Sequence, residues 1–267
     1  MRYAILLMAA LTWQQSVQQW RTDYEAGLKA PGGWLTVAGL FWLHEGDSVV
    51  GSDPQSDVVL PAGAPKRAGV LTRHGSAVTF EGEAFERRAL KADSTDEVKF
   101  GDVSMTIIAR SDKVGARLRD PHAEKVKNFT GCTWFPISDS WHVTAKWVPY
   151  AQPKKIPITN ILGMTEPEDS PGFVEFTLQN KRLRLEPVSE DGQLFFMFKD
   201  ATSGKTTYGA GRFLYAAMPK DGVVDLDFNK AKNPPCAFTA FATCPLPPKQ
   251  NTLAIAVEAG EKKYGHH

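Results

Sequence analysis

From residue 31 onwards, the chain is a succession of short hydrophobic runs separated by turn-forming residues. The runs are rich in Val, Ile, Phe, Thr and Leu, and clusters of Gly, Pro, Asp or Ser lie between them. Runs of this length and composition are typical of β-strands joined by turns. They include residues 35–43, 141–150, 156–159 and 253–259. Because no long helical pattern lies between them, we predict a mainly β fold with sandwich-like or barrel-like units.

One segment near the N-terminus has a different period. Within residues 16–28, a hydrophobic side chain recurs every three or four positions, at Val17, Trp20, Tyr24 and Leu28. This spacing places the hydrophobic side chains on one face of a helix. The Pro-Gly-Gly sequence at 31–33 ends that pattern. We therefore predict one short N-terminal helix and a linker within residues 13–32.

The first residues have the order of a secretory signal. Arg2 is followed by a short apolar run that reaches Leu11. That run is too short to cross a bilayer. We predict a signal peptide at residues 1–12 and a periplasmic or secreted mature protein without a membrane span. The alternative is an amphipathic helix that begins early.

The chain is long enough for two units. A polar segment at residues 120–128 contains a proline and separates two strand-rich regions. Domains commonly have roughly 100–200 residues, so we expect one β unit at residues 33–122 and a second at 123–267. The second unit includes a Pro-rich tail.

Charge and motifs exclude several classes of partner and cofactor. The 31 basic and 30 acidic residues nearly cancel, so no overall field attracts nucleic acid. The sequence has no Gly-rich nucleotide-binding motif and no Gly-x-Ser-x-Gly nucleophile motif. Its histidines lack metal-ligand spacing. We expect neither a cofactor nor a bound metal.

Two of the three cysteines lie close together in the Pro-rich tail. Cys236 and Cys244 are separated by seven residues between Pro-Pro and Pro-Leu-Pro-Pro sequences. In an oxidising compartment such a pair can form a disulfide that closes the loop. Two free thiols are the alternative. Cys132 has no neighbouring cysteine in the sequence.

The start of the first predicted unit resembles a known β-sandwich. Residues 46–61 are similar to the opening of forkhead-associated domains, which bind phosphothreonine. In that family an Arg follows the glycine, whereas Ser52 follows Gly51 here. The donors that would hold a phosphate are therefore missing. The resemblance implies the sandwich scaffold without its phosphopeptide recognition.

A second resemblance extends over most of the chain. It rests on four segments, at residues 33–43, 117–120, 208–214 and 226–238, the last of which reads LDFNKAKNPPCAF, and it ends at residues 259–261. These segments are similar to the bacterial domain of unknown function 1684 family. That family has no established activity, so the resemblance implies organisation and no mechanism.

The densest group of polar residues lies in the same C-terminal region. Its members are Tyr208, Arg212, Asp225, Asp227, Asn229 and Asn233. On a strand, the residues at 225, 227 and 229 would share one face, because side chains alternate. Facing Arg212, that row could bind a polar ligand. In the alternative interpretation, these residues form a salt bridge and cap turns.

Arg119 belongs to a second polar group near the predicted boundary. With Arg117 it would share a strand face, where guanidinium groups can hold a carboxylate or phosphate in two hydrogen bonds. A salt bridge between the two units is the alternative.

Three functions remain open from the sequence. The first is binding of a small polar or anionic ligand, or a peptide end, by Arg119, Tyr208, Arg212, Asn229 and Asn233. The second is a hydrolase in which Asp227 or Asp225 is the general base and Arg212 stabilises charge. The third is a structural or interaction module of the cell envelope.

Overall fold

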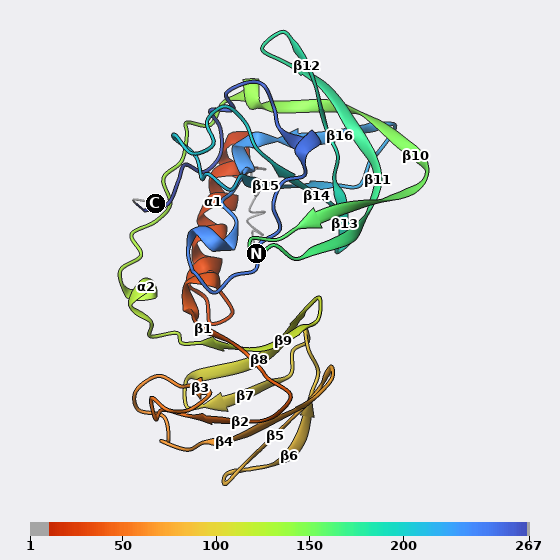
Figure 1. Ribbon diagram of the computed structural model, residues 1–267. Helices are drawn as coiled ribbons and strands as arrows, with labels where there is room; N and C mark the ends of the chain where they lie inside the picture. The colour runs from red at the N-terminus through yellow and green to blue at the C-terminus, as the bar shows by residue number, and fades with distance from the viewer. Residues whose placement is uncertain (1–10, 266–267) are drawn as a thin grey trace, which may run out of the picture.

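The computed structural model describes residues 11–265, and in it the chain is mainly β, as predicted. Four sheets account for the named strands (Figure 1). The predicted signal peptide falls largely on residues 1–10, which lie outside the described residues. Within residues 11–265, no helix has the length and hydrophobicity that crossing a membrane requires.

Nine strands form the N-terminal half: β1 (Val37–Trp42), β2 (Gly46–Gly51), β3 (Val58–Val59), β4 (Gly69–His74), β5 (Ala77–Gly82), β6 (Phe85–Leu90), β7 (Glu97–Phe100), β8 (Val103–Arg110) and β9 (Lys113–Arg119). They make one sheet in the order β1-β9-β8-β7 and another in the order β3-β2-β4-β5-β6. Buried side chains from both sheets pack into one cluster that contains Leu71, Phe80, Met105 and Leu118. The two sheets therefore form a sandwich, which lies at the bottom of Figure 1.

Seven strands form the C-terminal half: β10 (His142–Thr159), β11 (Thr165–Leu178), β12 (Lys181–Leu185), β13 (Val188–Glu190), β14 (Gln193–Phe198), β15 (Arg212–Ala217) and β16 (Val223–Asp227). Their sheets have the orders β12-β11-β10-β16 and β13-β14-β15. A shared cluster with Val174, Phe196, Leu214 and Leu226 lies between these sheets.

The N-terminal helix α1 (Trp13–Lys29) confirms the helical prediction. Thr12 and Gln15 form a capping box at its start, which satisfies two backbone donors. Val17 and Leu28 are buried, as the spacing predicted. Arg21 is buried beside them and donates to the carbonyls of two distant residues, both at 3.0 Å. This charged residue fixes α1 against the C-terminal half.

Short helical segments connect the strands. They are α2 (Glu124–Lys127) and the 3-10 helices η1 (Trp34–Thr36), η2 (Asp139–Trp141), η3 (Phe228–Lys230), η4 (Pro235–Ala237) and η5 (Lys249–Asn251). The hydrophobic run at 35–43 thus begins with a helical turn before β1.

Three of the predicted strands differ from the observed structure. The runs at 141–150 and 156–159 are parts of the single strand β10, which has a shift of register between Pro149 and Lys154. The run at 253–259 is not a strand, although its side chains alternate between buried and exposed. Two of its backbone groups pair with the backbone at Lys199 and Ala201, and others bond to side chains, as when Gln179 and Lys181 donate to its carbonyls.

Candidate functional site

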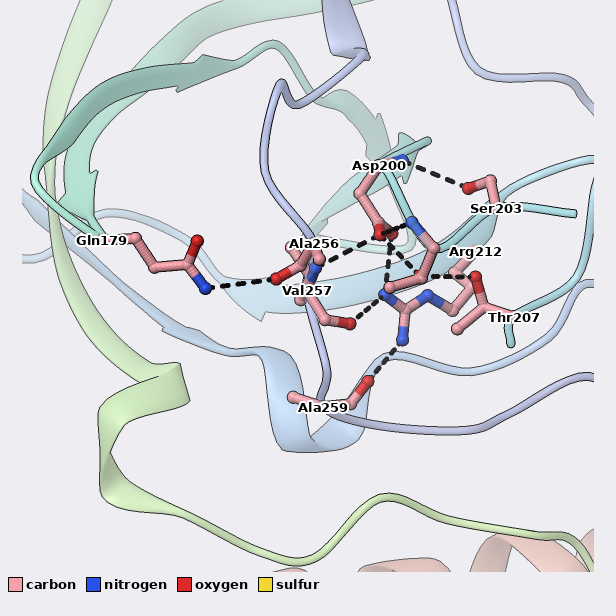
Figure 2. A network of polar contacts seen from close by, with 9 residues as sticks. Gln179, Asp200, Ser203, Thr207, Arg212, Ala256, Val257 and Ala259 are labelled. Carbon is pink, nitrogen blue, oxygen red and sulfur yellow. Dashed lines mark hydrogen bonds and ion pairs between the residues drawn. The ribbon is translucent and has the colours of Figure 1, made fainter. Parts of the chain in front are cut away.

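Arg212 lies at the centre of a buried polar network (Figure 2). Its Nη2 donates to Asp200 Oδ2 at 2.8 Å and to the Val257 carbonyl at 2.9 Å, and its Nη1 donates to the Ala259 carbonyl. Both members of the Arg212–Asp200 ion pair have side chains that are 0% exposed. Asp200 Oδ1 also accepts from Thr202 and from the Val257 N–H. The network fixes the 253–259 segment on the core.

This arrangement differs from the predicted row of acids facing Arg212. The two aspartates of β16 have other partners. Asp225 is exposed and accepts from His142 Nε2 at 2.6 Å. Asp227 is buried and accepts from Trp13 Nε1 at 3.2 Å and from the Asn229 backbone N–H at 3.1 Å.

Asn229 is fully buried and fully engaged. Its Nδ2 donates to Asp227 Oδ1 and to the Ser138 carbonyl, and its Oδ1 accepts from the Ser138 N–H. The residue follows β16 in the helical turn η3, so it does not continue the alternation of the strand. Asp227 and Asn229 together tie η3 to the segment before β10.

Tyr208 and the two tail cysteines form a third group. The Tyr208 hydroxyl donates to the Cys236 carbonyl at 3.3 Å, and the Cys236 N–H donates to Cys244 Sγ at 3.0 Å. Both cysteines have free thiols in this structure. A hydrogen bond from Cys244 lowers the pKa of Cys236, whereas that bond and burial raise the pKa of Cys244. The predicted disulfide stays a prediction for oxidising conditions.

Arg119 and Arg117 lie against Trp34 at the junction between the halves. Their guanidinium carbons are 5.6 and 5.3 Å from the Trp34 ring centroid. Arg119 donates to the Gly33 carbonyl at 2.9 Å. Arg117 is 5% exposed, and burial together with nearby Arg110 and Arg119 lowers its pKa to about 10. These cations support the indole that forms part of a cavity wall.

A cavity of about 270 Å³ lies between α1, the sheet β13-β14-β15, the Pro-rich tail and the end of β8. Aromatic rings make much of its wall, which is lined by Tyr24, Trp34, Phe195, Phe213, Tyr215 and Phe238. Arg110, Glu190, Lys232, Asn233, Thr243 and Cys244 supply its polar groups. Of the residues predicted from sequence as a site, Asn233 and Cys244 are the two that line this cavity.

Lys232 is the cavity residue with the most unusual surroundings. Its Nζ lies 4.9 Å from the ring centroid of Tyr215 and 5.3 Å from that of Tyr24. Among residues 11–265, no carboxylate lies within 4.0 Å of Nζ, and no hydrogen bond engages it. Burial lowers the pKa of Lys232, and the negative charges of Glu261 and Glu190 oppose that effect.

Asn233, the next residue, has a buried acceptor without a partner among the described residues. The side chain is 2% exposed, and its Oδ1 has no partner among the described residues. Its Nδ2 donates to the Lys262 carbonyl at 2.8 Å, and its backbone N–H donates to Glu261 Oε2 at 2.7 Å. These two bonds fix the orientation of the amide. A buried acceptor without a donor is costly, but burial keeps this oxygen out of reach of a ligand in the cavity.

Two carboxylates complete the surroundings of the cavity. Glu190 accepts from the Tyr215 hydroxyl at 2.6 Å, and with burial this bond raises the Tyr215 pKa. Glu261 is fully buried behind Tyr24, whose hydroxyl donates to it at 3.3 Å. Burial raises the pKa of Glu261 to about 7.

A second hollow, of about 440 Å³, adjoins the cavity. Glu190, Tyr215 and Lys232 line both of them. The amine and the phenol–carboxylate pair therefore stand between two spaces that a ligand can reach.

Sequence reasoning did not single out Lys232, Glu190 or Tyr215 as site residues. The sequence places Tyr24 on the hydrophobic face of the predicted helix. Lys232 does lie within the segment 226–238 that carries the family resemblance, next to Asn233. The sequence signal for Lys232 was its position next to Asn233, a predicted site residue.

Comparison with known proteins gives a family. No protein with a curated description matches the chain. The solution NMR structure of an uncharacterized protein from Haloarcula marismortui matches with a TM-score of 0.43 and 29% sequence identity, over 51% of this chain and 78% of that chain. A family described as a protein of unknown function (DUF1684) matches residues 127–262, which hold all of the cavity lining except Tyr24, Trp34 and Arg110. The chain therefore belongs to the DUF1684 family.

Proposed function

We propose that this protein binds a small organic molecule with a flat apolar body and an anionic or hydrogen-bonding end. The observation that carries the proposal is Lys232, a cation that faces a cavity with no partner among the described residues. The cavity is smaller than the roughly 300–1,000 Å³ typical of sites for drug-sized ligands. A ligand of one ring and one polar group suits this size.

The wall chemistry matches such a molecule. Aromatic rings from three separate parts of the chain offer faces and edges to an apolar ring, and offset or edge-to-face packing of rings is favourable. The polar groups are few and fixed, which is typical of small-molecule sites. Lys232 can hold an anionic end, and the carboxylate of Glu190, which also lines the cavity, can accept from an O–H or N–H group.

Benzoate, with benzyl alcohol as a neutral partner of similar shape, is a suitable first probe. At a concentration of about 100 times Kd, a single site stabilises the folded chain by ~2.7 kcal/mol. That corresponds to a rise in Tm of roughly 5–10 °C for a chain of about this size. We expect benzoate to give the larger rise and Lys232→Met to lose most of it.

Lys262→Met is the matched control for this experiment. Lys262 Nζ also lies over an aromatic ring, that of Phe135 at 4.8 Å, but the residue does not line the cavity. The control should keep the benzoate response. Equal responses of the parent and Lys232→Met, or no response from the parent to either probe, would refute binding at this cation.

The two alternative functions receive less support from the geometry. In the hydrolase hypothesis, Asp227 would have to be a base, yet both of its oxygens accept hydrogen bonds and Asp225 is on the surface. Arg212 is engaged with Asp200 and two carbonyls. A purely structural role does not account for the free amine of Lys232 in the cavity wall.

We also propose that residues 33–122 form one unit on a forkhead-associated-like scaffold and that residues 123–267 form a second. In support, the buried cluster of the N-terminal sandwich draws its fully buried members from residues 43–118. Gly51 belongs to the segment that resembles that scaffold, and a Cβ there would meet the Lys66 carbonyl at 1.9 Å. Limited trypsin digestion should cut first at the exposed Lys125 or Lys127.

Export to the periplasm or the medium is part of this proposal. It rests on the order of charge and apolar residues in the first 12 positions. Expression of the full chain with a C-terminal tag, followed by cell fractionation and N-terminal sequencing, tests it. A mature N-terminus near residue 13 supports export, and an uncleaved chain in the cytosol refutes it.

A further inference from the structure

We infer that Lys232 is a nucleophilic amine that condenses with the carbonyl carbon of a small aldehyde held in the cavity, forming an imine. The inference rests on the proposed function, because it names a class of molecule for the same site. It goes further by assigning a covalent step to one atom, Lys232 Nζ.

The first argument is that Lys232 differs from Arg110, the other cation in the cavity wall. Arg110 is paired with Asp93 at 2.8 Å and donates to Thr243 at 3.0 Å. These contacts give Arg110 a structural task. Lys232 has no such task among residues 11–265, since its Nζ reaches only the faces of two tyrosine rings. An amine without a partner is free to react.

The second argument is that the backbone of Lys232 is firmly held. Its N–H donates to the Phe213 carbonyl at 2.9 Å, and its carbonyl accepts from the Phe213 N–H at 2.8 Å. The next residue, Asn233, is fixed by Glu261 and the Lys262 carbonyl. A reactive group on a rigid support is positioned with little loss of entropy on reaction.

The third argument is that the surroundings favour the neutral amine. Burial among aromatic rings lowers the pKa of Lys232. Each unit by which an amine pKa falls gives about tenfold more of the nucleophilic form at a given pH below it. Lysines desolvated in apolar pockets are known to react with carbonyl compounds in this way.

The reaction needs no co-reactant. The neutral amine adds to the carbonyl carbon, so a C–N bond forms and the carbonyl oxygen takes up a proton. The resulting carbinolamine loses that oxygen as one water molecule, and a C=N bond remains. The Tyr215–Glu190 pair lines the same space.

Benzaldehyde tests the inference, because it combines one ring with one carbonyl group. The whole chain is treated at neutral pH with limiting benzaldehyde and sodium cyanoborohydride, which reduces an imine to a stable secondary amine. Intact mass then counts the benzyl groups, and peptide mapping locates them. We expect the Lys232 peptide to carry the dominant label, well above the Lys262 peptide, because the Lys232 amine lines the cavity without an ion pair among the described residues and burial lowers its pKa.

Lys232→Arg keeps a cation and removes the primary amine, so it should lose the dominant label. Lys262→Arg is the matched control and should keep it. Melting curves establish that both variants are folded.

The outcomes separate the two proposals. If benzoate stabilises the parent while benzaldehyde labels Lys232 no more than Lys262, the imine inference is wrong and the binding function stands. If neither probe acts on Lys232, both are wrong. Dominant labelling of Lys232 that persists when excess benzoate is added would place the reaction outside the cavity and would also overturn the inference.

Discussion

Replacement of Arg212 by methionine should strongly destabilise the C-terminal half. The substitution keeps most of the side-chain volume but leaves the Asp200 carboxylate buried without its cation. Removing one partner of a buried pair costs ~3–5 kcal/mol. The Val257 and Ala259 carbonyls lose donors as well. Since native chains are stable by only about 5–15 kcal/mol, Arg212→Met should lose a large part of the total.

The predicted loss corresponds to a fall in Tm of roughly 6–20 °C, at ~2–4 °C per kcal/mol for chains of about 150–250 residues. Urea unfolding followed by tryptophan fluorescence gives the free energy directly. Arg182→Met is the control, because Arg182 is exposed on β12 and its side chain makes no hydrogen bond within residues 11–265. Surface substitutions of this kind usually change stability by about 0.5 kcal/mol or less.

A double-mutant cycle identifies the cause of the loss. Asp200→Leu combined with Arg212→Met removes both charges, and replacing both members of a buried pair can be nearly neutral. The double variant should therefore lose less than the sum of the single variants, with a coupling energy of about 1–3 kcal/mol. If Arg212→Met is as stable as Arg182→Met, or if the losses simply add, the interpretation of Arg212 as a structural lock is wrong.

Three further predictions concern other groups. Burial raises the pKa of Glu261 in the folded chain to about 7, so its stabilising contribution is present below the unfolded pKa near 4.5 and is lost as pH rises through 7. Between pH 4.5 and pH 8, the stability of Glu261→Gln should therefore rise by up to ~3 kcal/mol relative to that of the parent. Urea unfolding measures this difference, and a difference that does not change with pH contradicts the prediction. Iodoacetamide should modify Cys236 before Cys244, because their hydrogen bond lowers the pKa of Cys236 and raises that of Cys244. Mild oxidation should protect both cysteines, and peptide mass mapping checks both outcomes. Gly260 and Gly222 have φ of 75° and 76°, but a Cβ on Gly260 would meet two backbone carbonyls at 2.3 and 2.8 Å. Gly260→Ala should therefore lower Tm more than Gly222→Ala, and equal losses would mean that backbone strain alone determines the effect.

The strand pattern was predictable because burial alternates along most strands. Leu226 and Val224 point into the core while Asp225 between them is exposed, as period two requires. The same reasoning failed at residues 253–259, where the side chains alternate but the backbone makes no strand ladder and bonds partly to side chains such as Arg212. Hydrophobic periodicity indicates which face is buried and carries no information about which groups satisfy the backbone.

The candidate site was much less predictable, because its residues are distant in sequence. Tyr24 belongs to α1, Tyr215 to β15 and Glu190 to β13. Their proximity depends on how α1 and the two C-terminal sheets pack, which no local motif specifies. The partner of Arg212 was missed for the same reason, since nothing in the sequence distinguishes Asp200 from the other acids.

The residues on which the family resemblance rests influence the cavity mainly by holding its lining residues in place. Asn233 is held by Glu261, and Lys232 is held by the backbone of Phe213, next to Arg212 in β15. The Arg212 network in turn fixes the segment that leads to Glu261. A chain of buried polar contacts thus fixes the backbone on both sides of the free amine. Loss of any member of such a network lowers the stability of the folded chain. The network is useful where a side chain must stay in one position. The polar cluster and the cavity are therefore two parts of one arrangement, in which the first positions residues that line the second.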